Sequence, residues 1–149
     1  MNNGDIIGKV HNSMYRQLQK DGVASPVGVL MDLGILSKED YERWRFGKVD
    51  YLERVCKINL HKLSFIMKEV RAYARKNNLK PSWTYYKQWG HKGKDTIKLR
   101  FSKSGQESVE QGYATHYISP QLSGKRREEK AATVKGSGDD GDHGESGDI

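Results

Sequence analysis

The sequence predicts an α+β fold that is mainly helical, and three observations support this prediction. Apolar residues recur at helical spacing through most of the first 78 residues. The segment Ile97–Phe101, in contrast, alternates apolar with basic residues as a strand does. A composition of 35% hydrophobic and 30% charged residues over 149 residues allows one modest core. We therefore expect a single domain over residues 4–120, with a helical bundle over 4–78 and a basic, aromatic part over 79–120.

Capping residues and apolar spacing place the helices of the first part. The expected helices run from about Asp5 to Asp21, over Pro26–Leu33, over Lys38–Arg45 and from Leu60 to about Asn77. Ser25 and Ser37 are typical N-cap residues, and Pro26 suits the first helical position. Asp50 with Glu53 indicates a further helix before Leu60. The buried face of the first helix is expected to contain Ile7, Val10, Met14 and Leu18, and that of the long helix Leu60, Leu63, Met67, Val70 and Ala74.

The second part is harder to interpret from the sequence. Ser82 caps a possible short helix from Trp83 to Trp89, and a glycine-rich turn then precedes the strand at Ile97–Phe101. Residues from Gln106 to about Tyr117 suit a final helix, with a strand over Tyr113–Ser119 as the alternative. A polar linker is expected over residues 121–135. Residues 136–149 are rich in Gly, Asp and Ser, which predicts a disordered acidic tail.

Positive charge is concentrated in one segment. The net charge of the chain is +7, but residues 71–103 alone contain ten Lys and Arg residues and a single acidic residue, Asp95. Residues 136–149 contain five acidic residues and no Lys or Arg. Such asymmetry favours a polyanionic partner for residues 71–103. The acidic tail is either a solubilising extension or a tethered competitor for that segment.

Aromatic residues lie among these basic residues, four of them between Trp83 and Trp89. Lys and Arg neutralise phosphates, and exposed aromatic rings stack on unpaired bases. The pattern therefore predicts non-catalytic nucleic-acid binding, with RNA or single-stranded DNA favoured over reading of the major groove. The candidate binding residues are Lys68, Arg71, Arg75, Lys76, Lys80, Trp83, Tyr85, Lys87, Trp89, Lys92, Lys94, Lys98, Arg100 and Lys103.

Two alternatives to this surface are considered, of which only the first stays open. The first is an adaptor or inhibitor whose basic face binds an acidic protein. Under either interpretation of the basic face, at most two of the four aromatic residues are expected to be exposed. The second is a helix-turn-helix formed by Pro26–Leu33 and Lys38–Arg45. Its second helix begins with Glu39 and Asp40, which would repel phosphates, so an ordinary helical hairpin is preferred.

Catalysis is a weaker hypothesis. The five histidines show no metal-binding motif, so no metal or cofactor is expected. His91 and His116 are the weak candidates for a small metal-independent nuclease, provided that both rings face one cleft.

Location is predicted from absent signals. No signal peptide and no membrane span are evident, and the single cysteine, Cys56, is expected to be a buried or half-buried thiol. These features favour a cytoplasmic protein without membrane contact, whose oligomeric state stays open.

Overall fold

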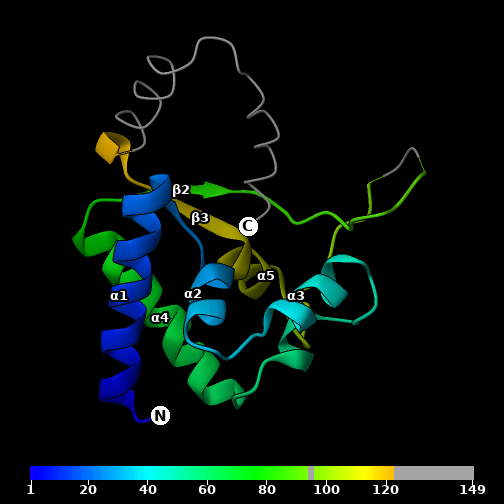
Figure 1. Cartoon of the computed structure of the whole chain (residues 1–149), viewed down its shortest axis with the longest axis horizontal. Coiled ribbons are helices and arrows are strands. Elements are labelled where there is room, and N and C mark those ends of the chain that lie inside the picture. The colour runs from blue at the N-terminus through cyan, green and yellow to red at the C-terminus, as the bar shows by residue number, and fades with distance from the viewer. Residues whose placement is uncertain (94–95, 123–149) are drawn as a thin grey trace.

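The computed structural model describes residues 1–93 and 96–122, and it confirms an α+β fold that is mainly helical (Figure 1). Along the chain the elements are α1 (Asn3–Asp21), β1 (Val23–Ala24), α2 (Pro26–Asp32), α3 (Lys38–Arg45), the 3₁₀ helix η1 (Leu52–Val55), α4 (Leu60–Lys76), β2 (Lys80–Trp83), α5 (Glu107–Ala114) and β3 (Thr115–Ile118). Within the described ranges, none of the helices has the length and apolar character needed to cross a bilayer.

The two long helices, α1 and α4, pack side by side and run in the same direction (Figure 1). Near their first turns, Lys62 Nζ donates to Asn3 Oδ1 at 3.2 Å. Further along, the ring of His11 lies 5.2 Å from that of Tyr73. β1 follows α1 and β2 follows α4, so each of the two helices is followed by a strand of the same small sheet.

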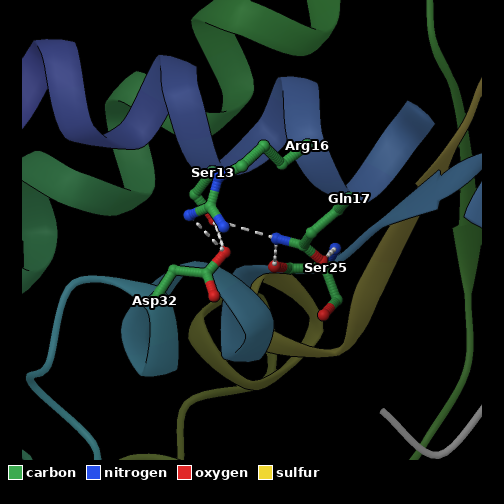
Figure 2. A network of polar contacts seen from close by, with 5 residues as sticks. All are labelled: Ser13, Arg16, Gln17, Ser25 and Asp32. Atoms are coloured by element: carbon green, nitrogen blue, oxygen red, sulfur yellow. Dashed lines mark hydrogen bonds and ion pairs between the residues drawn. The ribbon is translucent and has the colours of Figure 1, made fainter. Parts of the chain in front are cut away.

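A network of polar side chains joins α1 to α2 (Figure 2). The buried hydroxyl of Ser13 donates to Asp32 Oδ2 at 2.5 Å, and Arg16 approaches the same oxygen at 3.6 Å. Gln17 accepts from Ser25 N at 3.0 Å and donates to Ser25 O at 3.3 Å. A Cβ on Gly28 would lie 2.4 Å from the Gln17 amide oxygen, so the glycine lets this side chain reach α2.

The sheet has the order β1-β3-β2, with β3 antiparallel to both neighbours. Val23 of β1 and Lys80 of β2 both lie opposite Ile118. All four residues of β2 are exposed, and Pro81 in this edge strand provides no amide donor to a further strand. The edge strand therefore exposes its side chains on both faces.

The core joins the helices to the region that follows α4. Trp44 of α3 is fully buried, with its ring 5.6 Å from Tyr86 and 5.1 Å from Phe101. Its Nε1 also donates to Arg100 O at 2.8 Å. Buried side chains from Ile6 to Tyr117 belong to the same cluster.

Several details of the helices differ from expectation. Asn2, not Asp5, caps α1, and the core takes Ile6 while Ile7 is exposed. Leu60 is 52% exposed because it is the first residue of α4, ahead of the turns that pack on α1. The predicted helix after Asp50 is reduced to η1. η1 ends at Val55, and Asn59 marks the start of the next helix. Its side chain caps α4 by accepting from Lys62 N at 2.8 Å.

The larger errors concern the second part. The helix predicted over Trp83–Trp89 is wrong: Trp83 ends β2, and Lys87 forms an isolated antiparallel bridge with Lys98. That bridge is all that remains of the strand predicted at Ile97–Phe101. Both alternatives for the last segment are partly right, since α5 and β3 follow one another directly.

Cys56 is half-buried, and its Sγ lies 3.5 Å from Leu52 O. Burial is the main cause that raises the pKa of this thiol to about 12, with smaller contributions from Glu53 and Asp40. The expectation of a buried or half-buried thiol is confirmed, and a raised thiol pKa lowers the reactivity of the group. The predicted acidic tail and all of the linker after Leu122 lie outside the described residues.

Candidate functional site

The basic residues of the segment 71–103 share one property, which is exposure. Nine of the ten are described, and all nine are exposed: Arg71, Arg75, Lys76, Lys80, Lys87, Lys92, Lys98, Arg100 and Lys103. Lys68, one turn before Arg71, is exposed as well. We call these ten side chains, together with the exposed rings of Trp83 and Tyr85, the basic surface. Lys94 was also predicted to bind, and it lies outside the described residues.

Ion pairing distinguishes the arginines of the basic surface from three arginines elsewhere in the described residues. Arg16, Arg43 and Arg54 each lie within 4 Å of an aspartate, at 3.6, 3.1 and 2.7 Å. Among the ion pairs that join described residues, none involves a basic side chain of the basic surface. The surface therefore keeps a local excess of positive charge, which attracts polyanions.

One half of the basic surface is formed by α4 and β2. Arg71 and Arg75 are one turn apart on α4 and close to Tyr117 of β3. Burial raises the pKa of the Tyr117 hydroxyl, and the two guanidinium groups partly oppose that rise. Tyr117 lies opposite Pro81 in β2. The charges of Arg71 and Arg75 therefore act at the part of the sheet where Pro81 pairs with Tyr117.

The other half includes an arm, of which residues 86–93 and 96–99 are described, and these project from the body beside α3 (Figure 1). Its two sides are joined by the Lys87–Lys98 bridge and by two backbone hydrogen bonds. Gln88 N donates to Ile97 O, and Leu99 N donates to Tyr86 O, both at 2.8 Å. Lys87, Lys92 and Lys98 are exposed along the arm, so it carries cations away from the body.

Arg45 anchors the base of the arm to α3. This side chain is fully buried, and its guanidinium lies 4.4 Å from the ring centre of Trp89 and 5.1 Å from that of Tyr86. It donates to Lys87 O at 3.0 Å and to Tyr41 Oη at 2.8 Å. The contact between this part of the arm and α3 also explains why position 47 is a glycine. A Cβ there would lie 2.5 Å from the Gln88 amide oxygen, and the backbone φ of +77° favours glycine.

The four aromatic residues between Trp83 and Trp89 divide into an exposed pair and a pair that is buried or half-buried. This division agrees with the prediction that at most two of the four are exposed. Trp83 and Tyr85 are 57% and 43% exposed. Tyr86 is fully buried, whereas Trp89 is half-buried between Arg45 and Tyr41. Of these four residues, only Trp83 and Tyr85 offer exposed rings to a ligand, and Trp89 belongs to the contacts around Arg45.

The last basic residues of the segment are Arg100 and Lys103. They lie in a loop whose backbone amides donate hydrogen bonds to carboxylates. Glu110 accepts from Phe101 N, Ser102 N and Ser102 Oγ at 2.6–2.9 Å. Arg100 donates to the carbonyls of Ser102 and Lys103, which occupies part of its guanidinium. Arg100 is consequently a weaker candidate for phosphate contact than the lysines of the arm.

The two candidate catalytic histidines lie in unlike surroundings. His116 is 8% exposed, and its Nε2 lies 3.0 Å from the hydroxyl of buried Tyr86. His91 is exposed near the tip of the arm. The described contacts do not place both rings in one cleft, as the nuclease hypothesis requires. In residues 1–93 and 96–122, no group of three or more His, Cys, Asp or Glu side chains is arranged to hold a metal ion.

Sequence reasoning missed the residues that hold the surface in place. Neither Arg45 nor Glu110 is among the candidate residues that the sequence predicts. The aromatic residues around Arg45, namely Tyr41, Trp44 and Phe46, were a signal that this arginine is enclosed.

Comparison with protein-family models, with curated proteins and with solved structures returned no match for this chain.

Proposed function

We propose that this protein binds nucleic acid, with RNA or single-stranded DNA favoured, and acts as a binding protein rather than as an enzyme. One observation carries the proposal: the nine described basic side chains of residues 71–103 are exposed and lack ion-pair partners among the described residues, and two open aromatic rings lie among them. Phosphates can neutralise these cations, and unpaired bases can stack on these rings.

The shape of the surface supports the same proposal. Exposed cations are distributed over three elements, α4, the edge strand and the arm, whose arrangement Figure 1 shows. This spread suits an extended chain of phosphates better than a single small anion. The arm is anchored at its base by Arg45, so its lysines are held in position before binding. Such preorganisation lowers the entropy cost of association.

A titration of a labelled single-stranded RNA of mixed sequence, followed by fluorescence anisotropy at about 50 and about 200 mM salt, tests the proposal. Neutralising about four phosphates would weaken binding about 50-fold between these conditions. Excess polyglutamate should compete poorly, because it offers charge without bases. Absence of binding at the lower salt would overturn the proposal. Equal competition by polyglutamate would favour an acidic protein partner instead.

A further inference from the structure

The alternation of side chains along β2 sorts the basic surface into two faces. Residues opposite one another in an antiparallel pair point to the same face. Trp83 lies opposite Thr115 and Pro81 opposite Tyr117, so these four residues share one face of the sheet. Ser82 and Lys80, opposite His116 and Ile118, belong to the other face.

Tyr117 lies on the face that carries Trp83, and α4 carries two exposed arginines near the end that leads into β2. The charges of Arg71 and Arg75 act to lower the pKa of the Tyr117 hydroxyl. Trp83 therefore shares its face with a tyrosine that experiences both guanidinium charges. Lys80, although equally exposed, is directed to the opposite face.

Tyr85 continues this face beyond the end of β2. Its neighbour Tyr86 is directed inward and bonds to His116, on the opposite face of the sheet from Trp83. Tyr85 itself is exposed, and the Lys98 ammonium lies 5.4 Å from its ring centre. A second open ring with its own cation thus follows Trp83 after two residues.

We propose that the ligand is a single strand, and that two of its unpaired bases stack on Trp83 and Tyr85 while Arg71, Arg75 and Lys98 hold the adjoining phosphates. This inference rests on the proposed function. It adds that Trp83 and Tyr85 are the residues that distinguish a single strand from a duplex. A duplex keeps its bases stacked on each other, so it can reach the cations but not the rings. A peptide strand added to β2 is less favoured, because Pro81 interrupts the hydrogen-bonding edge.

The test compares a labelled 12-nucleotide RNA with the same RNA annealed to its complement. We expect the wild-type protein to bind the single strand more tightly than the duplex. Trp83→Ala should weaken single-strand binding about 5- to 150-fold, the range for loss of one stacked base, and should change duplex binding less than about twofold. Arg75→Ala should weaken binding of both ligands and make the salt dependence of single-strand binding shallower by about 0.7.

Three controls make the result specific. Tyr15→Ala removes a ring that is 56% exposed on α1, and Lys9→Ala removes an exposed cation of the same helix; neither residue belongs to the basic surface, so both variants should bind RNA nearly as wild type does. Trp83→Phe keeps an aromatic face and should recover part of the loss. Circular dichroism and thermal unfolding show whether each variant is folded, and Tyr85→Ala provides an independent second variant.

The outcomes separate this inference from the proposed function. If wild type binds RNA but Trp83→Ala and Tyr85→Ala bind as Tyr15→Ala does, the stacking platform is wrong and the proposed function stands. Equal affinity for single strand and duplex also overturns the platform. If wild type binds neither ligand at low salt, both proposals fail.

Discussion

Arg16 and Arg75 are both exposed arginines on long helices, but their surroundings differ. Arg16 belongs to the joint between α1 and α2, where it lies 3.6 Å from Asp32 within a network that also uses Ser13 and Gln17 (Figure 2). Arg75 lies on the basic surface, without an ion-pair partner among the described residues. At the joint, charge is balanced within the chain and holds two helices together. On the basic surface, the same charge is left for a partner.

The joint and the surface should therefore respond differently to substitution. Removing a group that is bonded within the chain leaves its partners unsatisfied and lowers stability. Removing an unpaired surface cation should leave stability unchanged and weaken ligand binding.

Arg45→Ala should give the largest loss, because this guanidinium fills the space between Tyr86 and Trp89 and bonds to Lys87 O. We expect unfolding free energy to fall by about 3 kcal/mol or more, as for other large-to-small changes in a core. Chemical denaturation measures the loss. The matched control is Arg43→Ala, an exposed arginine of the same helix, which should cost less than about 1 kcal/mol. Equal losses in the two variants would contradict the anchoring role.

Glu110→Ala should lower stability by about 2 kcal/mol, because two backbone amides and the Ser102 hydroxyl lose their acceptor. Glu107→Ala, an exposed residue in the first turn of the same helix, should cost no more than about 0.5 kcal/mol. Thermal unfolding of the two variants measures the difference. A loss at Glu110 no larger than at Glu107 would mean that water replaces the carboxylate in this loop.

Gly28→Ala should destabilise the protein by about 1 kcal/mol, although alanine is the better helix former. The added Cβ would displace Gln17 from its two bonds to Ser25. In a Gln17→Ala background the obstacle is gone, and Gly28→Ala should then stabilise the helix by up to about 1 kcal/mol. A double-mutant cycle measures this change of sign. The same effect in both backgrounds would show that the contact does not limit this position.

Arg71→Ala and Arg75→Ala should change unfolding free energy by no more than about 0.5 kcal/mol each, since neither has an ion-pair partner among the described residues. Relief of repulsion between the two guanidinium groups could raise stability slightly. Chemical denaturation, compared with Arg16→Ala at the joint, measures the effect. A loss above about 1 kcal/mol would show that these arginines hold the fold together.

The helices were predictable because their signals are local. Ser25 with Pro26 marks the first turn of α2, and Ser37 marks that of α3; both serines accept the expected backbone amide, at 3.0 and 3.1 Å. The exposed stripe of Lys68, Arg71 and Arg75 on α4 was predicted for the same reason. Capping and helical spacing act within a few residues, so a single sequence contains them.

The region after α4 was harder to predict because its structure depends on distant partners. Residues 80–83 become a strand by pairing with β3, more than thirty positions later in the chain. Residues 86–89 are fixed by Arg45 and the core rather than by local preference. For the candidate site, sequence showed which side chains carry charge, whereas pairing with β3 decides that Trp83 and Lys80 are directed to opposite faces.

The central claim is that the exposed cations clustered on this surface, and not net charge alone, bind nucleic acid. Two double variants test it most directly by single-stranded RNA titration at low salt. Lys87→Glu with Lys92→Glu reverses two charges on the arm, while Lys9→Glu with Lys38→Glu makes the same net change elsewhere on the exposed surface. We predict that the arm variant binds at least about tenfold more weakly than wild type, with a shallower salt dependence, and that the other variant binds nearly as wild type does. Equal weakening in both variants would contradict the claim.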